Sequence, residues 1–208
     1  DPGKISHGWL AVNTVAGPNA NTNVFTYAGA RPERWTQAEE PWFHGFWMYY
    51  WADQHQKAVS IATNTKTITL GAIPNFGIAA GQPYYAENLL EEITRPGEWY
   101  VNRSTGMLYF WPPAPLAGAD IWVSLLEQPL WRLKDTTHVV VRDITLDMGR
   151  ADLVAIEGGT RNAFIHCTLR NAGNYAGRVS GTSNGVSSCV ISHTGEGGIA
   201  LSGASSRA

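Results

Sequence analysis

The sequence predicts an all-β protein in two parts: an aromatic-rich, β-sandwich-like domain over residues 1–115, then about three coils of a right-handed parallel β-helix over residues 116–208. Three observations favour this fold. Glycine (22) and tryptophan (9) are abundant, which is typical of turn-rich β structure. The first part consists of short β-rich runs between turns. The second part repeats a pattern of apolar residues every 22 or 23 residues.

Two β-hairpins are predicted in the first part. In "KAVSIATNTKTITLG", the β-rich runs 57–62 and 66–70 are joined by a short polar turn. In "RPGEWYVNRSTGMLYFWPP", residues 98–101 and 107–110 flank a turn that ends at Gly106. Both segments place aromatic or β-branched residues in the strands, so we expect antiparallel pairing in each.

Between these hairpins, "YYAENLLEEI" (84–93) is the one stretch whose composition predicts a helical turn or two. Pro96 and Gly97 would end that helix. Three prolines follow the second hairpin, at positions 112, 113 and 115, and they mark the predicted end of the first domain.

In the second part, several sets of residues recur with the same period of 22 or 23 residues. Residues of similar type recur in four sets: Ile144, Cys167 and Cys189; Leu146, Leu169 and Ile191; Ile156, Val179 and Leu201; Gly158, Gly181 and Gly203. Leucine-rich repeats have a similar period, but their leucine consensus is absent here. A parallel β-helix fits better, with apolar residues stacked inside and Gly or Asn at corners that need left-handed backbone angles. Residues 119–146 would supply the first coil.

The two cysteines occupy equivalent inward positions of adjacent coils. We interpret Cys167 and Cys189 as two stacked small apolar residues, with a disulfide or a reactive thiol as the open alternatives. Two cysteines make neither a disulfide framework nor a zinc motif.

The low content of charged residues bears on which kinds of partner the protein can bind. Charged residues make up 15% of the chain and the formal net charge is -2, so we expect neither a nucleic-acid nor an anionic-membrane partner. No apolar run approaches the roughly 18 residues that a membrane helix needs. The chain ends at "LSGASSRA" without a capping element, and we therefore expect it to be a fragment of a longer protein.

The segment "YYAENLLEEITRPGEWYVNRSTGMLYFWPP", together with "IEGG", "NAFIHCTLRNAG" and "HTGEGGIALSG", resembles bacterial right-handed parallel β-helix carbohydrate-active proteins. It looks in particular like the large glycoside hydrolases with a β-sandwich inserted near the start of the helix. The resemblance implies a bacterial protein that acts on a polysaccharide or oligosaccharide. We expect it to be secreted or periplasmic and to use no cofactor. It also implies that the catalytic groups lie on coils after residue 208, so no catalytic residue is carried over.

Glycoside hydrolysis usually needs two carboxylates on either side of the scissile bond. Glu157 and Glu196 are the catalytic candidates on the coils. Glu157 follows the inward Ile156, so alternation points it outward, and Glu196 lies in the turn before the third repeat. For both, a solvated surface position is the competing interpretation. A polysaccharide lyase is an alternative, but no acidic cluster suited to calcium is evident.

The run "PWFHGFWMYYW" (41–51) contains seven aromatic residues. Rings of this kind stack on the C–H faces of sugars, so the candidates for substrate binding are Trp42, Trp47, Tyr49 and Trp51. Aromatic residues occupy both parities of the run, which favours a strand buried on both sides over a sugar platform. A carbohydrate-binding accessory module and a structural β-helix segment therefore stay open beside the enzyme.

No metal site is predicted. The six histidines show neither a His-x-x-x-His nor a Glu-x-x-His pair. His44 and His55 lie among aromatic residues, and we interpret them as structural hydrogen-bonding groups.

Overall fold

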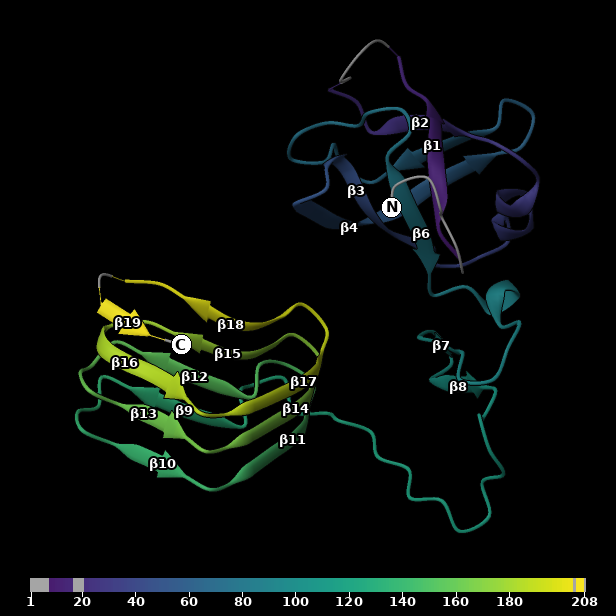
Figure 1. Cartoon of the computed structure of the whole chain (residues 1–208). Coiled ribbons are helices and arrows are strands. Elements are labelled where there is room, and N and C mark those ends of the chain that lie inside the picture. The colour runs from purple at the N-terminus through teal and green to yellow at the C-terminus, as the bar shows by residue number, and fades with distance from the viewer. Residues whose placement is uncertain (1–7, 17–20, 204, 208) are drawn as a thin grey trace. The chain divides into compact units, whose positions relative to one another are not determined.

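The computed structural model describes residues 8–16, 21–203 and 205–207 (Figure 1). The chain divides into two compact units, residues 1–118 and 119–208. Strands dominate both, as predicted, and two short 3-10 helices occur in the first unit, η1 (Arg31–Trp35) and η2 (Leu90–Glu92). Within the described residues, no helix has the length and apolar character that crossing a bilayer requires.

Six antiparallel strands of the first unit close into a barrel in the order β1-β2-β5-β4-β3-β6. Their bounds are β1 (Leu10–Thr14), β2 (Val24–Tyr27), β3 (Trp42–Tyr49), β4 (Ala52–Ala62), β5 (Thr67–Leu70) and β6 (Pro83–Glu87). The strands form two antiparallel sheets that share β1 and β4. The sandwich-like arrangement therefore closes on itself, and closure pairs the edge strands.

Alternation along β3 divides the aromatic run between two environments. Phe43 and Trp47 point into the barrel and are 0% and 2% exposed. Trp42, His44 and Phe46 lie on the outer side of the same strand and are only partly covered. The inward rings pack against other aromatic residues of the barrel core, which include Phe25, Trp35 and Tyr84. Over residues 42–47, one parity of the run is thus core and the other is surface, whereas Tyr49 and Trp51, which follow an irregularity in the strand pairing, are exposed.

Both predicted hairpins are present. β4 and β5 form the first, and β7 (Trp99–Asn102) and β8 (Met107–Phe110) form the second. Of the helical turn or two predicted within residues 84–93, only η2 is present, because residues 84–87 belong to strand β6. Tyr84 is fully buried in the barrel, and β6 pairs with both β1 and β3. This pairing overrides the helix-favouring composition.

A largely buried carboxylate links the two 3-10 helices. Glu92 accepts hydrogen bonds from Arg31 Nη2 (2.6 Å) and Trp35 Nε1 (2.6 Å), and it also pairs with Arg34. Burial alone would raise the pKa of Glu92, but the hydrogen bonds from Arg31, Trp35 and Arg34 hold that pKa below its usual range. The ionised carboxylate therefore fixes η2 against η1.

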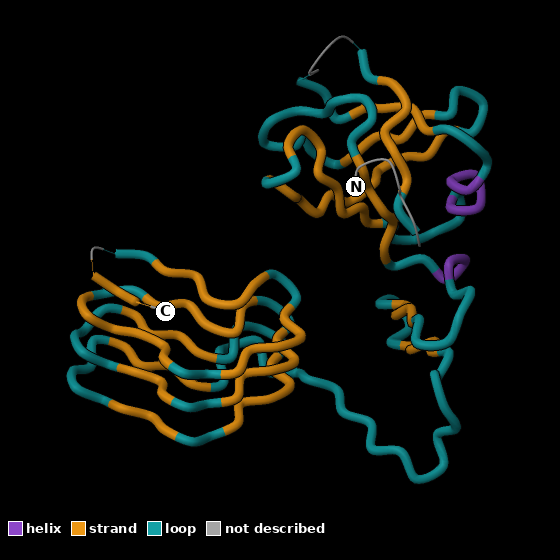
Figure 2. Tube along the Cα trace, in the orientation of Figure 1, coloured by secondary structure: helices purple, strands orange, loops and turns teal. Residues whose placement is uncertain are grey.

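The second unit is a parallel β-solenoid of about three coils, as predicted (Figures 1 and 2). One sheet contains β9 (Trp131–Lys134), β12 (Val154–Glu157), β15 (Tyr175–Val179) and β18 (Gly197–Leu201). The second contains β10 (Val140–Arg142), β13 (Ala163–Ile165), β16 (Thr182–Ser187) and β19 (Ser205–Arg207). The third contains β11 (Thr145–Gly149), β14 (Thr168–Ala172) and β17 (Val190–Thr194).

The predicted registers are confirmed. Leu146 pairs with Leu169, which pairs with Ile191, and Ile156 pairs with Val179, which pairs with Leu201. Ile156 and Val179 lie in the solenoid core. Leu201, on the last described strand of its sheet, is 46% exposed. The strands of the first coil begin at Trp131, so the prediction placed the start of the coil too early.

Left-handed backbone conformations recur at four equivalent positions of the coils. The sets with positive φ are Asp135, Gly158, Gly181 and Gly203; His138, Arg161 and Ser183; Asp143, His166 and Ser188; Met148, Asn171 and His193. Glycine or asparagine was expected at such corners, but most of these residues are neither. A left-handed conformation costs a non-glycine residue about 1–2 kcal/mol. Pairing with the neighbouring coils therefore imposes the corner geometry.

One corner accommodates a difference in coil length. Ile156 pairs with Val179, 23 residues later, whereas Thr160 forms a bridge with Thr182, 22 residues later. The extra residue of the earlier coil lies between these points, where Gly159 has a φ of +65°. A Cβ at Gly159 would lie 2.0 Å from the carbonyl oxygen of Thr136, so only glycine fits there.

Both cysteines are free thiols. Cys167 is buried in the solenoid core and Cys189 packs against that core from the next coil. The backbone N–H of Cys167 donates to Cys189 Sγ at 3.2 Å, and burial raises the pKa of the Cys189 thiol. They are stacked small residues, as interpreted from the repeat.

Candidate functional site

The two candidate catalytic carboxylates lie on one sheet of the solenoid. Glu157, at the end of β12, is held by Arg132 of β9 through two hydrogen bonds, Nε to Oε1 (3.0 Å) and Nη2 to Oε2 (2.5 Å). The hydrogen bond from Arg132 holds the pKa of Glu157 below its usual range. A carboxyl group held ionised in this way is a poor general acid, because that role needs a raised pKa.

The structure does not bring Glu196 to Glu157. Glu157 directly follows Ile156, which is in register with Leu201, whereas Glu196 precedes β18. At about 3.3 Å per residue, the backbone positions of the two residues are separated by about 20 Å along the strands. The separation that hydrolysis requires is about 5–9.5 Å. These two residues therefore do not form a glycosidase pair.

The four candidate aromatic residues fall into two groups. Trp47 belongs to the barrel core, where its Nε1 donates to the carbonyl oxygen of Gln54 at 2.8 Å. Trp42 is partly buried on the outer side of β3. In contrast, Tyr49 and Trp51 are 45% and 72% exposed. The structure leaves these last two accessible to a ligand.

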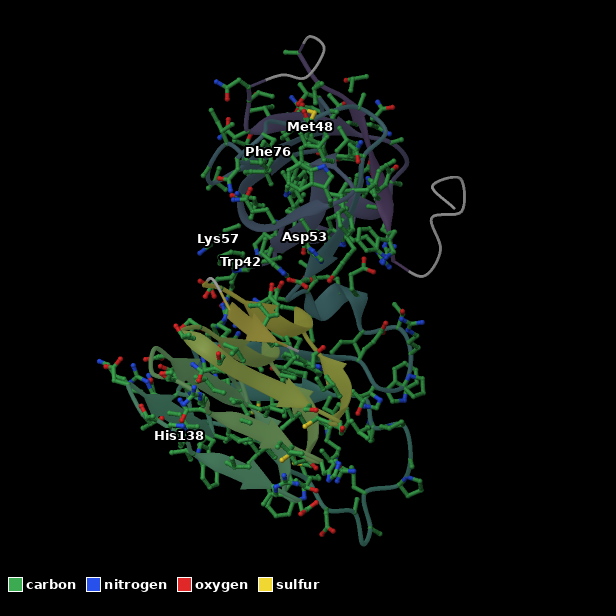
Figure 3. All side chains as sticks on the ribbon, turned by 60° about the vertical axis from the view of Figure 1, so that its left-hand side comes forward. Trp42, Met48, Asp53, Lys57, Phe76 and His138 are labelled. Atoms are coloured by element: carbon green, nitrogen blue, oxygen red, sulfur yellow. The ribbon has the colours of Figure 1, made fainter. Side chains whose placement is uncertain are left out.

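Phe76, labelled in Figure 3, lies on the barrel, and its ring contacts the rings of Tyr49 and Trp51. We call these three residues the exposed aromatic cluster. The Tyr49 and Trp51 rings are stacked with centroids 5.4 Å apart and planes at 8°. Phe76 lies edge-on to both, at 5.6 Å from Tyr49 and 5.3 Å from Trp51, and is itself 50% exposed. No sequence pattern indicated Phe76, because it is an isolated aromatic residue in a loop.

Two features of the barrel position this cluster. Tyr50 and Trp51 form the two-residue connection between β3 and β4, where Asn, Asp and Gly are usually preferred. The loop that carries Phe76 is tied to the barrel by hydrogen bonds from Asn75 N to Gln54 Oε1 (3.0 Å) and from Ala79 N to Trp47 O (2.8 Å). The aromatic rings are therefore held in place before any ligand arrives.

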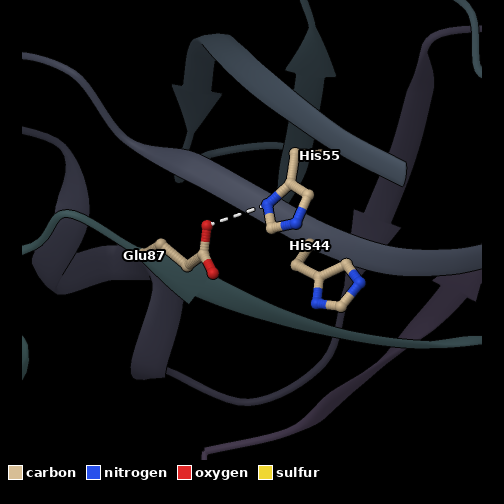
Figure 4. A group of neighbouring side chains, drawn as sticks. All are labelled: His44, His55 and Glu87. Atoms are coloured by element: carbon tan, nitrogen blue, oxygen red, sulfur yellow. Dashed lines mark hydrogen bonds and ion pairs between the residues drawn. The ribbon is translucent and has the colours of Figure 1, made fainter. Parts of the chain in front are cut away.

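A second group of candidate side chains lies on the outer side of the barrel, on three neighbouring strands (Figure 4). His44 of β3 is directly opposite His55 of β4, and Glu87 lies on β6. We call these three residues the histidine cluster. Their potential ligand atoms all lie within 4.8 Å of one another. Spacing along the chain could not indicate this cluster, because strand pairing alone brings the residues together.

Hydrogen bonds order the histidine cluster. His44 Nε2 is 2.8 Å from Asp53 Oδ2 and His44 Nδ1 is 2.7 Å from Tyr85 Oη. His55 Nδ1 is 3.0 Å from Glu87 Oε2. The two imidazole rings are stacked with centroids 4.3 Å apart and planes at 8°. The hydrogen bond with His44 lowers the pKa of Asp53. The expected hydrogen-bonding role of both histidines is present, within an arrangement that could also hold a cation.

Comparisons with protein-family models, with curated proteins and with solved structures found no match.

Proposed function

We propose that the exposed aromatic cluster binds an oligosaccharide or a polysaccharide chain. The observation that supports this proposal is the 72% exposure of Trp51 beside the stacked ring of Tyr49. Sugars present apolar C–H faces that stack on aromatic rings, and the hydroxyl groups around those faces remain solvated. A cluster that is already ordered loses little side-chain entropy when a ligand binds.

A protein core does not explain this exposure, since large aromatic side chains gain most when they are buried. The β3–β4 connection also has no need of aromatic residues, because its favoured residues are small and polar. Both arguments favour a recognition role for Tyr49 and Trp51 over a packing role.

The wider role proposed for this chain is carbohydrate binding within a bacterial, secreted or periplasmic polysaccharide-degrading glycoside hydrolase. The support for the enzyme is the sequence resemblance described above, together with a parallel β-solenoid, an architecture that presents long surfaces. The separation of Glu157 from Glu196 argues against bond cleavage by that pair. We therefore assign binding, and not catalysis, to the exposed aromatic cluster.

The test is a titration of the chain with a panel of plant and algal oligosaccharides, followed by tryptophan fluorescence. We expect saturable quenching with at least one of them, and Trp51→Ala should weaken binding about tenfold or more, which corresponds to about 1.4 kcal/mol. The matched control is Trp99→Ala, which removes a tryptophan of similar exposure (63%) from β7. Equal affinity in the parent and Trp51→Ala would overturn the proposal. Release of reducing ends by the parent chain would show catalysis and contradict a purely binding role.

A further inference from the structure

The histidine cluster has the donor types of a transition-metal site. Imidazole nitrogens and a carboxylate oxygen are ligands that Zn²⁺ prefers, and a two-histidine, one-carboxylate set is a known combination for it. Here the donors come from three adjacent strands of a closed barrel, so the backbone holds them at fixed spacing. Glu87 also supplies a negative charge beside His55.

The hydrogen bonds of His44 indicate which nitrogen is free of a proton. An ionised carboxylate only accepts hydrogen bonds, so the contact with Asp53 places the proton of neutral His44 on Nε2. His44 Nδ1 then carries the lone pair and accepts from the hydroxyl group of Tyr85. A metal-bound histidine commonly donates its second N–H to a carboxylate, and Asp53 already provides that partner.

The contact between His55 and Glu87 provides the other two donors. At 3.0 Å, His55 Nδ1–H donates to Glu87 Oε2. A divalent cation can replace this proton, after which the nitrogen and the oxygen both become ligands. The stacked rings do not point toward one centre, so binding requires His55 to turn. It also requires the hydroxyl group of Tyr85 to release the lone pair of His44 Nδ1. The His55 side chain is 42% exposed and has room for that rotation.

We propose that His44, His55 and Glu87 bind one divalent transition-metal ion of the Zn²⁺ class on the outer side of the barrel. Asp53 acts as the positioning residue that orients His44. Zinc–nitrogen bonds of about 2.0–2.1 Å require the ligand atoms to approach more closely than the present limit of 4.8 Å. Three protein ligands leave a fourth position for water or for an oxygen atom of a ligand.

The proposal is tested by calorimetric titration of the whole chain with Zn²⁺, and by visible absorption after titration with Co²⁺. We expect one ion per chain, the absorption of a tetrahedral Co²⁺ site, and a metal-dependent rise in the melting temperature. Binding should release protons to the buffer, because the cation replaces the proton shared between His55 and Glu87. His55→Ala and Glu87→Gln should each weaken binding about tenfold or more.

The matched control is His138→Ala, which removes an exposed histidine of the second unit and should leave the affinity unchanged. Glu87→Gln preserves side-chain size, so it remains informative even if His55→Ala reduces stability. Absence of saturable Zn²⁺ binding to the parent chain would overturn the proposal. The same conclusion would follow from binding that neither His55→Ala nor Glu87→Gln weakens.

Discussion

Asn162 and Asn184 lie in adjacent coils of the solenoid and are joined by two hydrogen bonds. Asn184 Oδ1 accepts from the backbone N–H of Asn162 at 2.8 Å and from its Nδ2 at 3.1 Å. The two residues are 0% and 1% exposed. Asn162 Oδ1 in turn accepts from Val139 N at 3.1 Å. Together, the two side chains provide hydrogen bonds to buried polar groups at a corner of the coils, where backbone pairing between strands does not provide them.

We predict that Asn184→Ala destabilises the second unit by about 2–4 kcal/mol, because it leaves several buried polar groups without partners. These include the backbone N–H of Asn162 and the carbonyl oxygens of Gly158 and Ser180. Urea unfolding, followed by circular dichroism, measures the change. Asn64→Ala, in the exposed turn between β4 and β5, is the control and should change stability little. Equal effects of the two substitutions would contradict the role of the buried pair.

Close backbone approach between coils gives a second prediction. A Cβ at Gly173 would lie 2.0 Å from the carbonyl oxygen of Arg150, an atom that the neighbouring coil holds in place. Gly173→Ala should therefore lower the free energy of unfolding by about 2–3 kcal/mol or more. Gly198 has no atom within 4 Å of its Cβ position, so Gly198→Ala is the matched control. If thermal melting shows similar stability for both variants, the spacing between coils is looser than described.

The carboxylate of Glu92 gives a pH-dependent prediction. Its pKa is lowered in the folded state, so it stabilises the fold above its unfolded value of about 4.3, and this contribution is lost as the pH falls through the folded value. At pH 7, Glu92→Gln should be less stable than the parent by about 1–3 kcal/mol. Chemical denaturation across pH 3 to 7 should show this difference closing at the acidic end.

Glu91→Gln, on the exposed neighbour of Glu92 in η2, is the control and should follow the parent at every pH. A deficit of Glu92→Gln that persisted unchanged at pH 3 would indicate a steric effect instead of a lost ionic interaction.

The solenoid could be predicted because apolar, inward-facing residues recur once in every coil. A residue such as Leu169 must stack on equivalents in both neighbouring coils, so its apolar character repeats with the coil. The corners were less predictable. Arg161 and Met148 adopt positive φ values that their residue types disfavour, since pairing between coils dominates local preference.

In the barrel, local patterns predicted the hairpins but not the site. Trp47 is buried, but the strand irregularity between Gly45 and Tyr49 leaves Tyr49 exposed, and a run with aromatics at both parities does not reveal this. Phe76 and Glu87 reach their clusters through a loop contact and through the pairing of β3 with β6. Contacts of this kind, between segments far apart in the chain, cannot be predicted from the spacing of residues along a single sequence.

The corner at Gly159 has a consequence for how this fold can vary. Because the additional residue is absorbed there, Val179 stays beneath Ile156 and Thr182 stays beside Thr160. A coil could thus be extended at this bend without turning any interior side chain toward water. The bend therefore tolerates a one-residue difference between neighbouring coils while the strand pairing on both sides of it is kept.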